Sequence, residues 1–215
     1  MSTSIPPAPE GTRLALIRAG IRLFGLQGFS ATSVRQLANE AQANIAAITY
    51  HFGGKDGLRL ACAEEFGRRM GAATGARVVG GDISPDSARE ELRTIVRTML
   101  GFLLDAKGAS ELVPFMLREL AENGPGIDIV YRGFAEPTHR RLCLLWAQAT
   151  GTEAEDESVK LAVFALIGQL MYFRIGQPIV SRRMGWAAIG PAELRQITDR
   201  IIRNLDAMLA GEKGE

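Results

Sequence analysis

A short stretch near residue 50 has side chains suited to contact with another molecule rather than to catalysis. The pattern predicts a helix from Ile45 to about His51, with Ile48 and Phe52 pointing back at the preceding helix. Its outer face has no Lys, Arg, Asp or Glu, whereas a solvated surface helix usually carries charge. The outer residues are Ala46, Ala47, Thr49, Tyr50 and His51. Small side chains and methyl groups suit base edges in the major groove of DNA, and the polar groups suit phosphates.

Two short helices joined by a tight turn would position these side chains. The first is expected over residues 34–41, because its apolar residues recur at i, i+3, i+4 and i+7. Ser33 and Gln36 have the spacing of a capping box at its start. Asn44 is a suitable N-cap for the second helix. The spacing fits a helix-turn-helix, whose second helix lies in the major groove, or an ordinary helical hairpin in which the alanines serve only packing.

Motifs around these helices form a block that is specific as a whole. The block is Thr32-Ser33-Val34-Arg35-Gln36-Leu37-Ala38, then Ile48-Thr49-Tyr50-His51-Phe52-Gly53-Gly54-Lys55-Asp56-Gly57-Leu58, with Leu23-Phe24 and Gly28-Phe29 upstream. It resembles the DNA-binding domain of the tetracycline-repressor (TetR/AcrR) family over about residues 12–60. Two positions depart from the family pattern, because Gln42 replaces the usual turn glycine and Gly54 replaces a capping serine. Residues 43–55 also resemble a subgroup with a CerR-type C-terminal domain.

This resemblance implies an all-α protein with a three-helix DNA-binding head that contains the helix-turn-helix. It also implies a larger helical bundle for ligand binding and dimerisation, with about nine helices in the whole chain. The implied function is a ligand-responsive, sequence-specific transcriptional regulator, most often a repressor that a small-molecule effector releases from double-stranded operator DNA. The residues expected at the DNA are Thr32, Ser33, Arg35, Asn44, Ile45, Ala46, Ala47, Thr49, Tyr50, His51 and Lys55. An activator of the same fold, or a small-molecule-binding bundle with a non-functional DNA head, are the alternatives.

Breaks in the pattern divide the chain, and no strand pattern occurs anywhere in it. We expect a disordered tail over 1–11, the DNA-binding domain over 12–60, a linking helix and loose connection over 61–83, and the regulatory domain over 84–210. In the regulatory domain, helices are expected from Ser84, over 111–122, over 127–149 with a kink near Pro137, over 155–175 and from Gly190 to about 209. A turn is expected over 105–109 and a loop between Gln177 and Gly190.

The last two helices indicate a homodimer. Leu194, Ile197, Ile201, Leu205 and Met208 form a narrow apolar stripe on the final helix. The helix before it is apolar on nearly all sides, more than the core of one chain needs. The pair is therefore expected to pack against its symmetry mates as a four-helix bundle, unless both stripes are used inside one chain.

Residues that could line an effector pocket lie on the inner faces of the body helices. They are Met99, Phe102, Phe115, Met116, Glu119, Phe134, His139, Cys143, Trp146 and Met171. Plain core packing is the alternative for each of them. His139, Cys143 and Glu136 could share a helix face, but no fourth metal ligand is evident, and neither a metal nor a cofactor is expected. No nucleophile–base set, phosphate-binding loop or carboxylate pair is present, so no enzyme is predicted.

Composition and charge favour a soluble regulatory protein. The chain has 215 residues, 47% of them hydrophobic, and a net charge of +1, which excludes a strongly basic architectural protein. The first sixty residues have six basic and three acidic side chains, which suits a nucleic-acid-binding head. Cys62 and Cys143 predict no disulfide and a reducing cytoplasm. The uninterrupted apolar run 161–167 is far shorter than a membrane span, and the N-terminus lacks a signal peptide.

Overall fold

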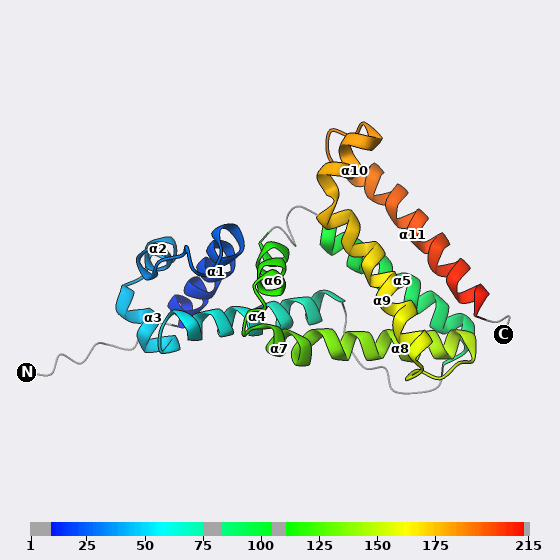
Figure 1. Cartoon of the computed structure of the whole chain (residues 1–215), viewed down its shortest axis with the longest axis horizontal. Helices are drawn as coiled ribbons and strands as arrows, with labels where there is room; N and C mark the ends of the chain where they lie inside the picture. The colour runs from blue at the N-terminus through cyan, green and yellow to red at the C-terminus, as the bar shows by residue number, and fades with distance from the viewer. Residues whose placement is uncertain (1–9, 75–82, 105–110, 213–215) are drawn as a thin grey trace, which may run out of the picture. The chain divides into compact units, whose positions relative to one another are not determined.

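Every regular element that the structure describes is helical, which confirms the predicted fold class (Figure 1). The structure is a computed structural model that describes residues 10–74, 83–104 and 111–212. The elements are α1 Glu10–Gln27, α2 Val34–Glu40, α3 Ile45–Phe52, α4 Lys55–Thr74, α5 Pro85–Leu104, α6 Leu112–Ala121, α7 Ile127–Val130, a π-helical turn Tyr131–Ala135, α8 Glu136–Thr150, α9 Glu157–Ile175, α10 Gln177–Met184 and α11 Pro191–Gly211. The predicted turn over 105–109, and most of the predicted tail and connection, lie outside the described residues.

The predicted loop after Gln177 is wrong, because α10 occupies most of it. Pro178 stands in the first turn of this helix, where its missing N–H would have no intrahelical partner in any case. Proline therefore starts a helix here as well as ending the previous one. Gly185, with φ of 71°, ends α10 in the left-handed conformation that glycine adopts without steric cost.

The irregularity predicted near Pro137 takes the form of a π-helical turn. This turn runs from Tyr131 to Ala135, directly before α8. A proline ring clashes with the carbonyl four residues earlier, which here belongs to Gly133. A wider turn at this point relieves that clash, so the helical chain continues past the proline.

The chain forms two compact units, and the predicted head shares its unit with α6 and α7. The first unit contains residues 10–69 and 111–133 among those described. α6 lies very close to α1, since a Cβ at Gly25 would be only 2.9 Å from the backbone nitrogen of Phe115. The core of this unit includes the fully buried Leu16, Ile21, Phe24, Leu37, Ile48, Leu58 and Phe115.

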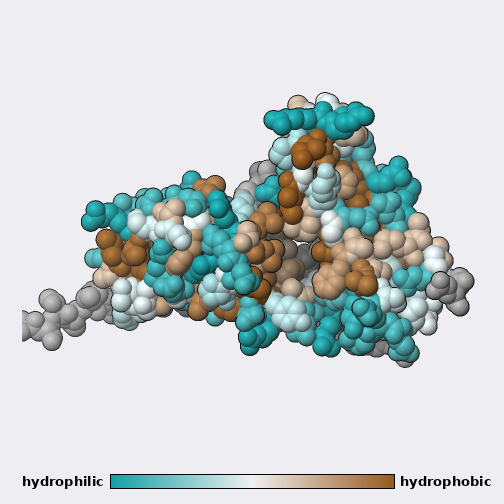
Figure 2. Space-filling model, viewed as in Figure 1, coloured by the Kyte–Doolittle hydropathy of each residue, from teal (hydrophilic) through white to brown (hydrophobic). Residues whose placement is uncertain are grey.

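The second unit contains residues 70–104 and 134–212, with a core of α5, α8, α9 and α11. The apolar stripe of α11 is used inside this unit, because Ile197, Ile201 and Leu205 are at most 3% exposed. Burial of this stripe inside one chain was the alternative to its use in a dimer interface. α9 retains an uncovered apolar face, and Figure 2 shows hydrophobic surface gathered over α9 and α10.

α9 is also the one described helix that is long and apolar enough to cross a membrane by length and composition. The uninterrupted apolar run 161–167 is much shorter than this helix, because Gly168 and Gln169 interrupt the apolar residues of α9. An inner face buried in the unit and an outer apolar face produce the same average hydropathy as a membrane span.

Acid is expected to weaken α4 through Glu65. Hydrogen bonds from Arg68, with a further one from Arg69, hold the pKa of Glu65 at about 2. Because this pKa is below that of the unfolded chain, the stabilisation is complete above about pH 4.5 and is lost as the pH falls toward about 2. Glu65→Gln should therefore cost about 1 kcal/mol or less near neutral pH and nothing near pH 2, as measured by urea denaturation at a series of pH values. An equal loss of unfolding free energy in Glu65→Gln near neutral pH and near pH 2 would contradict this.

Candidate nucleic-acid interface

The first helix of the predicted pair begins with the capping box that its sequence indicates. The Ser33 hydroxyl accepts from the backbone N–H of Gln36 at 3.2 Å. The side-chain oxygen of Gln36 accepts from the backbone N–H of Ser33 at 2.8 Å. Both caps confirm the prediction and fix where α2 starts.

The turn and the second helix are also formed as predicted. Gln42 adopts a φ of 50°, so the left-handed residue of the turn is made without the usual glycine. The side-chain oxygen of Asn44 accepts from the N–H of Ala46 at 2.9 Å and starts α3. Gly53, with φ of 71°, ends it. α3 is therefore a helix of eight residues with defined caps at both ends.

The outer face of α3 is exposed and uncharged. Ile45 and Tyr50 are 45% and 61% exposed, and Ala46 and Thr49 are exposed as well. Ile48, on the other face, is fully buried. This arrangement offers a small apolar and hydroxyl-bearing surface to whatever approaches the helix.

Ala47 and His51 differ from the rest of the predicted outer face. Ala47 is only 9% exposed, so its placement on the outer face is wrong. It lies next to Ile48 on the helix, at the border of the face that packs inward. His51 is half-buried, and its Nε2 atom has no hydrogen-bond partner within the described chain.

Lys55 and Thr32 are engaged within the protein. The Lys55 ammonium donates to the carbonyl of Phe29 at 2.8 Å and to that of Thr32 at 2.7 Å. The Thr32 hydroxyl is buried and donates to the carbonyl of Gly28 at 2.7 Å. Both side chains hold the turn between α1 and α2, which in turn positions the helix pair. Arg35, in contrast, is exposed, and no ion pair joins it to any described side chain.

A buried ion pair ties α4 to α6 in the same unit. Arg59 and Glu119 are 7% and 2% exposed, and their closest atoms, Nε and Oε1, are 2.5 Å apart. Arg59 also donates to Glu122 at 2.9 Å, and the backbone N–H of Gly126 donates to Glu119 at 3.2 Å. The Arg59 guanidinium lies over the Phe29 ring at 4.5 Å. This cluster connects α6 to the turn that Lys55 holds.

The residues predicted to line an effector pocket are divided between the two units. Phe115, Met116 and Glu119 belong to the first unit, where Phe115 is core and Glu119 is the partner of Arg59. The second unit contains Met99, Phe102, Phe134, His139, Cys143, Trp146 and Met171. Of these, Met99, Cys143 and Trp146 are buried, and Trp146 is fully so.

His139 connects α8 to α9 rather than facing solvent. Its ring stacks on Phe164 with centroids 4.0 Å apart, and its Nε2 atom is 3.2 Å from the carbonyl oxygen of Lys160. The Cys143 thiol is 3.6 Å from its other nitrogen, and burial raises the pKa of that thiol. In the described residues no three His, Cys, Asp or Glu side chains are placed to hold a metal ion.

Two buried polar atoms on α8 have no partner in the part of the chain that the structure describes. They are Nε1 of Trp146 and Oγ1 of Thr138. The two residues are eight positions apart, so their side chains leave the helix about 80° apart around its axis. A buried donor without a partner is costly, so both atoms are candidates for ligand contacts. Sequence reasoning included Trp146 but missed Thr138, because a threonine on a helix gives no signal of its own.

Comparison with known proteins gives matches in both halves of the chain. Residues 16–62 match the family model described as bacterial regulatory proteins, tetR family. Residues 88–212 match the model for the C-terminal domain of the HTH-type transcriptional dual regulator CecR. The matched C-terminal type is CecR, where the sequence resemblance pointed to a CerR-type domain. The CecR of Shigella flexneri is 33% identical over 209 residues, which cover 94% of this chain and 93% of that protein.

Solved structures of the same fold are more distant in sequence. A TetR-like transcriptional regulator from Rhodococcus sp. RHA1 is 20% identical, with a TM-score of 0.67 over 97% of this chain and all of the other. AibR, solved with isovaleryl coenzyme A and operator DNA, is 17% identical, with a TM-score of 0.66 over 89% of this chain and 96% of its own. These two likenesses concern the fold.

Proposed function

The chain belongs to the TetR family of bacterial transcriptional regulators, and from this premise we propose that it is a homodimeric repressor which a small molecule releases from operator DNA. The observation that carries the DNA-binding part is the exposed and uncharged face of α3. A double-stranded DNA partner, an effector and a cytoplasmic location all follow from this role.

The α3 face supports direct reading of bases. Ala46 and Thr49 offer methyl groups and a hydroxyl, and Ile45 adds an aliphatic side chain at the start of the helix, where a recognition helix meets the bases. Tyr50 and Arg35, which are both exposed, would contact the phosphate backbone. Asn44 and Ser33 act mainly as helix caps, and any DNA contact would be added to that role.

The uncovered face of α9 supports the homodimer. Leu161, Phe164, Tyr172 and Ile175 are each more than half exposed, and they recur at helical spacing along one side. An apolar stripe of this length is rarely left open to water on a monomer. A two-fold pair of chains would cover it, and would present two α3 helices to one duplex. α11 contributes to this interface less than its sequence predicted, because its apolar stripe is already buried.

The inner face of α8 supports the effector site. Among the described residues Nε1 of Trp146 has no hydrogen-bond partner, and Met99 and Cys143 of the same unit are buried apolar residues. This N–H would pair with a carbonyl or similar acceptor on a mostly apolar molecule. Such a molecule would change the population of the DNA-binding conformation only if it bound the two conformations with different affinity.

A gel-shift experiment on the DNA flanking the gene tests the proposed function. We expect retention of one specific fragment in the presence of excess competitor DNA, and its release by a compound found in a thermal-shift screen of apolar metabolites and drugs. Thr49→Val should change which base pairs are preferred while the affinity for non-specific DNA stays the same. Binding to all fragments alike at low salt would reject sequence-specific regulation.

Arg35 and Lys55 are expected to affect DNA binding in different ways. Arg35→Gln should reduce the slope of log affinity against log salt by about 0.9, because one phosphate contact is lost. Lys55→Gln should weaken binding with little change of slope, because its ammonium is used by the carbonyls of Phe29 and Thr32. Fluorescence anisotropy with labelled operator at several salt concentrations measures both. A slope that falls by about 0.9 for Lys55→Gln as well would place Lys55 at a phosphate.

A further inference from the structure

Half of the cations in the DNA-binding head are already used inside the protein. Lys55 and Arg59 donate to acceptors of the first unit. Arg22 forms an ion pair with Glu40. The outer face of α3 itself has no charge, so cations for DNA phosphates have to come from the helices around it. Among the described residues, three of the six basic side chains in the first sixty residues form no hydrogen bond or ion pair: Arg13, Arg18 and Arg35.

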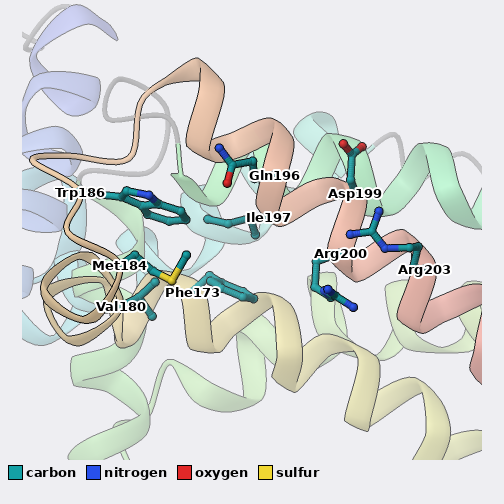
Figure 3. Close-up of a pocket in the computed structure, with 9 residues that line it drawn as sticks. All are labelled: Phe173, Val180, Met184, Trp186, Gln196, Ile197, Asp199, Arg200 and Arg203. Atoms are coloured by element: carbon teal, nitrogen blue, oxygen red, sulfur yellow. The ribbon is translucent and has the colours of Figure 1, made fainter.

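Free cations of the second unit have a different setting. Arg200 and Arg203 line a groove between α9, α10 and α11, together with Asp199 (Figure 3). This groove lies on the outward side of α9 and α11, the side that the proposed homodimer would cover. These two arginines are therefore expected to face the partner chain, which leaves the head as the source of cations for DNA.

Arg13 lies at the end of the helix that is expected to read bases. It belongs to the start of α1, and its Cζ atom lies over the ring of Phe52, 5.5 Å from the ring centre. Phe52 is the last residue of α3, two positions after the exposed Tyr50. Figure 1 shows the start of α1, in dark blue, near this end of α3. The cation–π contact orients the guanidinium, while no described acceptor takes its N–H donors.

Arg18 is also exposed, but it faces a different part of the head. Since it follows Arg13 by five positions, its side chain leaves α1 about 140° further around the axis. It borders a pocket that Glu40 and Glu111 also line. These two carboxylates would repel a phosphate. Of the two free arginines on α1, only Arg13 is therefore suited to contact DNA.

We propose that Arg13 is a phosphate contact of the DNA-binding head and that Phe52 holds it in position. A guanidinium matches a phosphate because its planar fork of donors pairs with two oxygens at once. The contact would add α1 to the elements that touch the duplex, beside Tyr50 of α3 and Arg35 of α2. Because phosphates are the same at every base pair, Arg13 would contribute affinity and salt dependence but no base preference. This inference rests on the proposed function, since it requires that α3 is presented to duplex DNA.

Fluorescence anisotropy with labelled operator at several salt concentrations tests the proposal. Arg13→Gln should reduce the slope of log affinity against log salt by about 0.9 per chain bound, because one phosphate contact is lost. Arg13→Lys, which keeps the charge, should keep most of that slope. Arg18→Gln is the matched control, because it removes an exposed arginine of the same helix, and it should leave the slope unchanged. An unchanged slope in Arg13→Gln, or an equal fall in Arg18→Gln, would overturn the proposal.

A second measurement locates the contact on the DNA. In a set of operators that each carry one uncharged methylphosphonate linkage, we expect a linkage at which the native chain loses affinity and Arg13→Gln does not. If Arg13→Gln is sensitive at every linkage that matters to the native chain, the proposal is wrong. Failure of the proposed function gives a different result, because the native chain would then bind all duplexes alike. The salt slope of Arg13→Gln on any such duplex would still decide whether Arg13 contacts a phosphate, whereas a native chain that binds no duplex would overturn both proposals.

Discussion

Glu119→Ala is expected to reduce the free energy of unfolding of the first unit by about 3 kcal/mol, because it leaves the Arg59 guanidinium buried with one partner removed. Arg59 and Glu119 are 7% and 2% exposed, so water cannot replace the lost carboxylate without opening the contact between α4 and α6. The N–H of Gly126 also loses its acceptor. Urea denaturation followed by circular dichroism would measure the change.

Glu122→Gln is the matched control for this prediction. Glu122 also pairs with Arg59, at 2.9 Å, but its side chain is 35% exposed. A partly solvated partner should contribute about 1 kcal/mol or less. If Glu119→Ala and Glu122→Gln reduce the free energy of unfolding equally, the burial of Glu119 has no particular role in stability. Arg59→Met combined with Glu119→Leu should recover part of the loss, because it leaves no fully buried ion unpaired, and Glu122, which then loses Arg59, is 35% exposed to water.

Gly57→Ala is expected to destabilise the junction between α3 and α4 by about 3 kcal/mol, the upper part of the range for overpacking. A Cβ at Gly57 would lie 1.8 Å from the carbonyl oxygen of Phe52, the last residue of α3. The position of a Cβ is fixed by the backbone and the carbonyl is part of the backbone, so no side-chain rotation relieves the clash and α3 has to move. Operator affinity should therefore fall along with stability, as measured by anisotropy and thermal unfolding.

Gly71→Ala in the same helix provides the opposite expectation. A Cβ at Gly71 meets no described atom within 4 Å, and its position in α4 favours alanine over glycine by about 0.5–1 kcal/mol. Melting temperature should rise and operator affinity should stay the same. If Gly57→Ala and Gly71→Ala both lower stability, the loss at Gly57 cannot be assigned to the contact with Phe52.

Local signals made most of the DNA-binding head predictable. Ser33, Gln36 and Asn44 satisfy backbone donors within a few residues of themselves, so their roles could be read from spacing alone. The resemblance around Tyr50 added the family, and the comparisons confirmed it. Ala47 was misplaced because a helix of eight residues has a narrow outer face, and a small side chain at its border gives no hydrophobic signal.

The remaining features depend on contacts between distant parts of the chain. Nothing near Lys55 in the sequence indicates that its ammonium holds two carbonyls about twenty-five residues earlier. Glu119 was correctly identified as a buried charge that needs a partner, but that partner, Arg59, is sixty residues away. α10 was missed because Gln177-Pro178 ends one helix and starts another with the same residues.

The ring of Phe29 serves two cations at once, with Lys55 Nζ at 4.1 Å and Arg59 Cζ at 4.5 Å from its centre. An aliphatic replacement would fill the space but would offer no negative π-face to either charge. Divergent descendants of this gene should therefore keep a benzenoid side chain at position 29, and tolerate leucine there only where one of the two cations has also been lost.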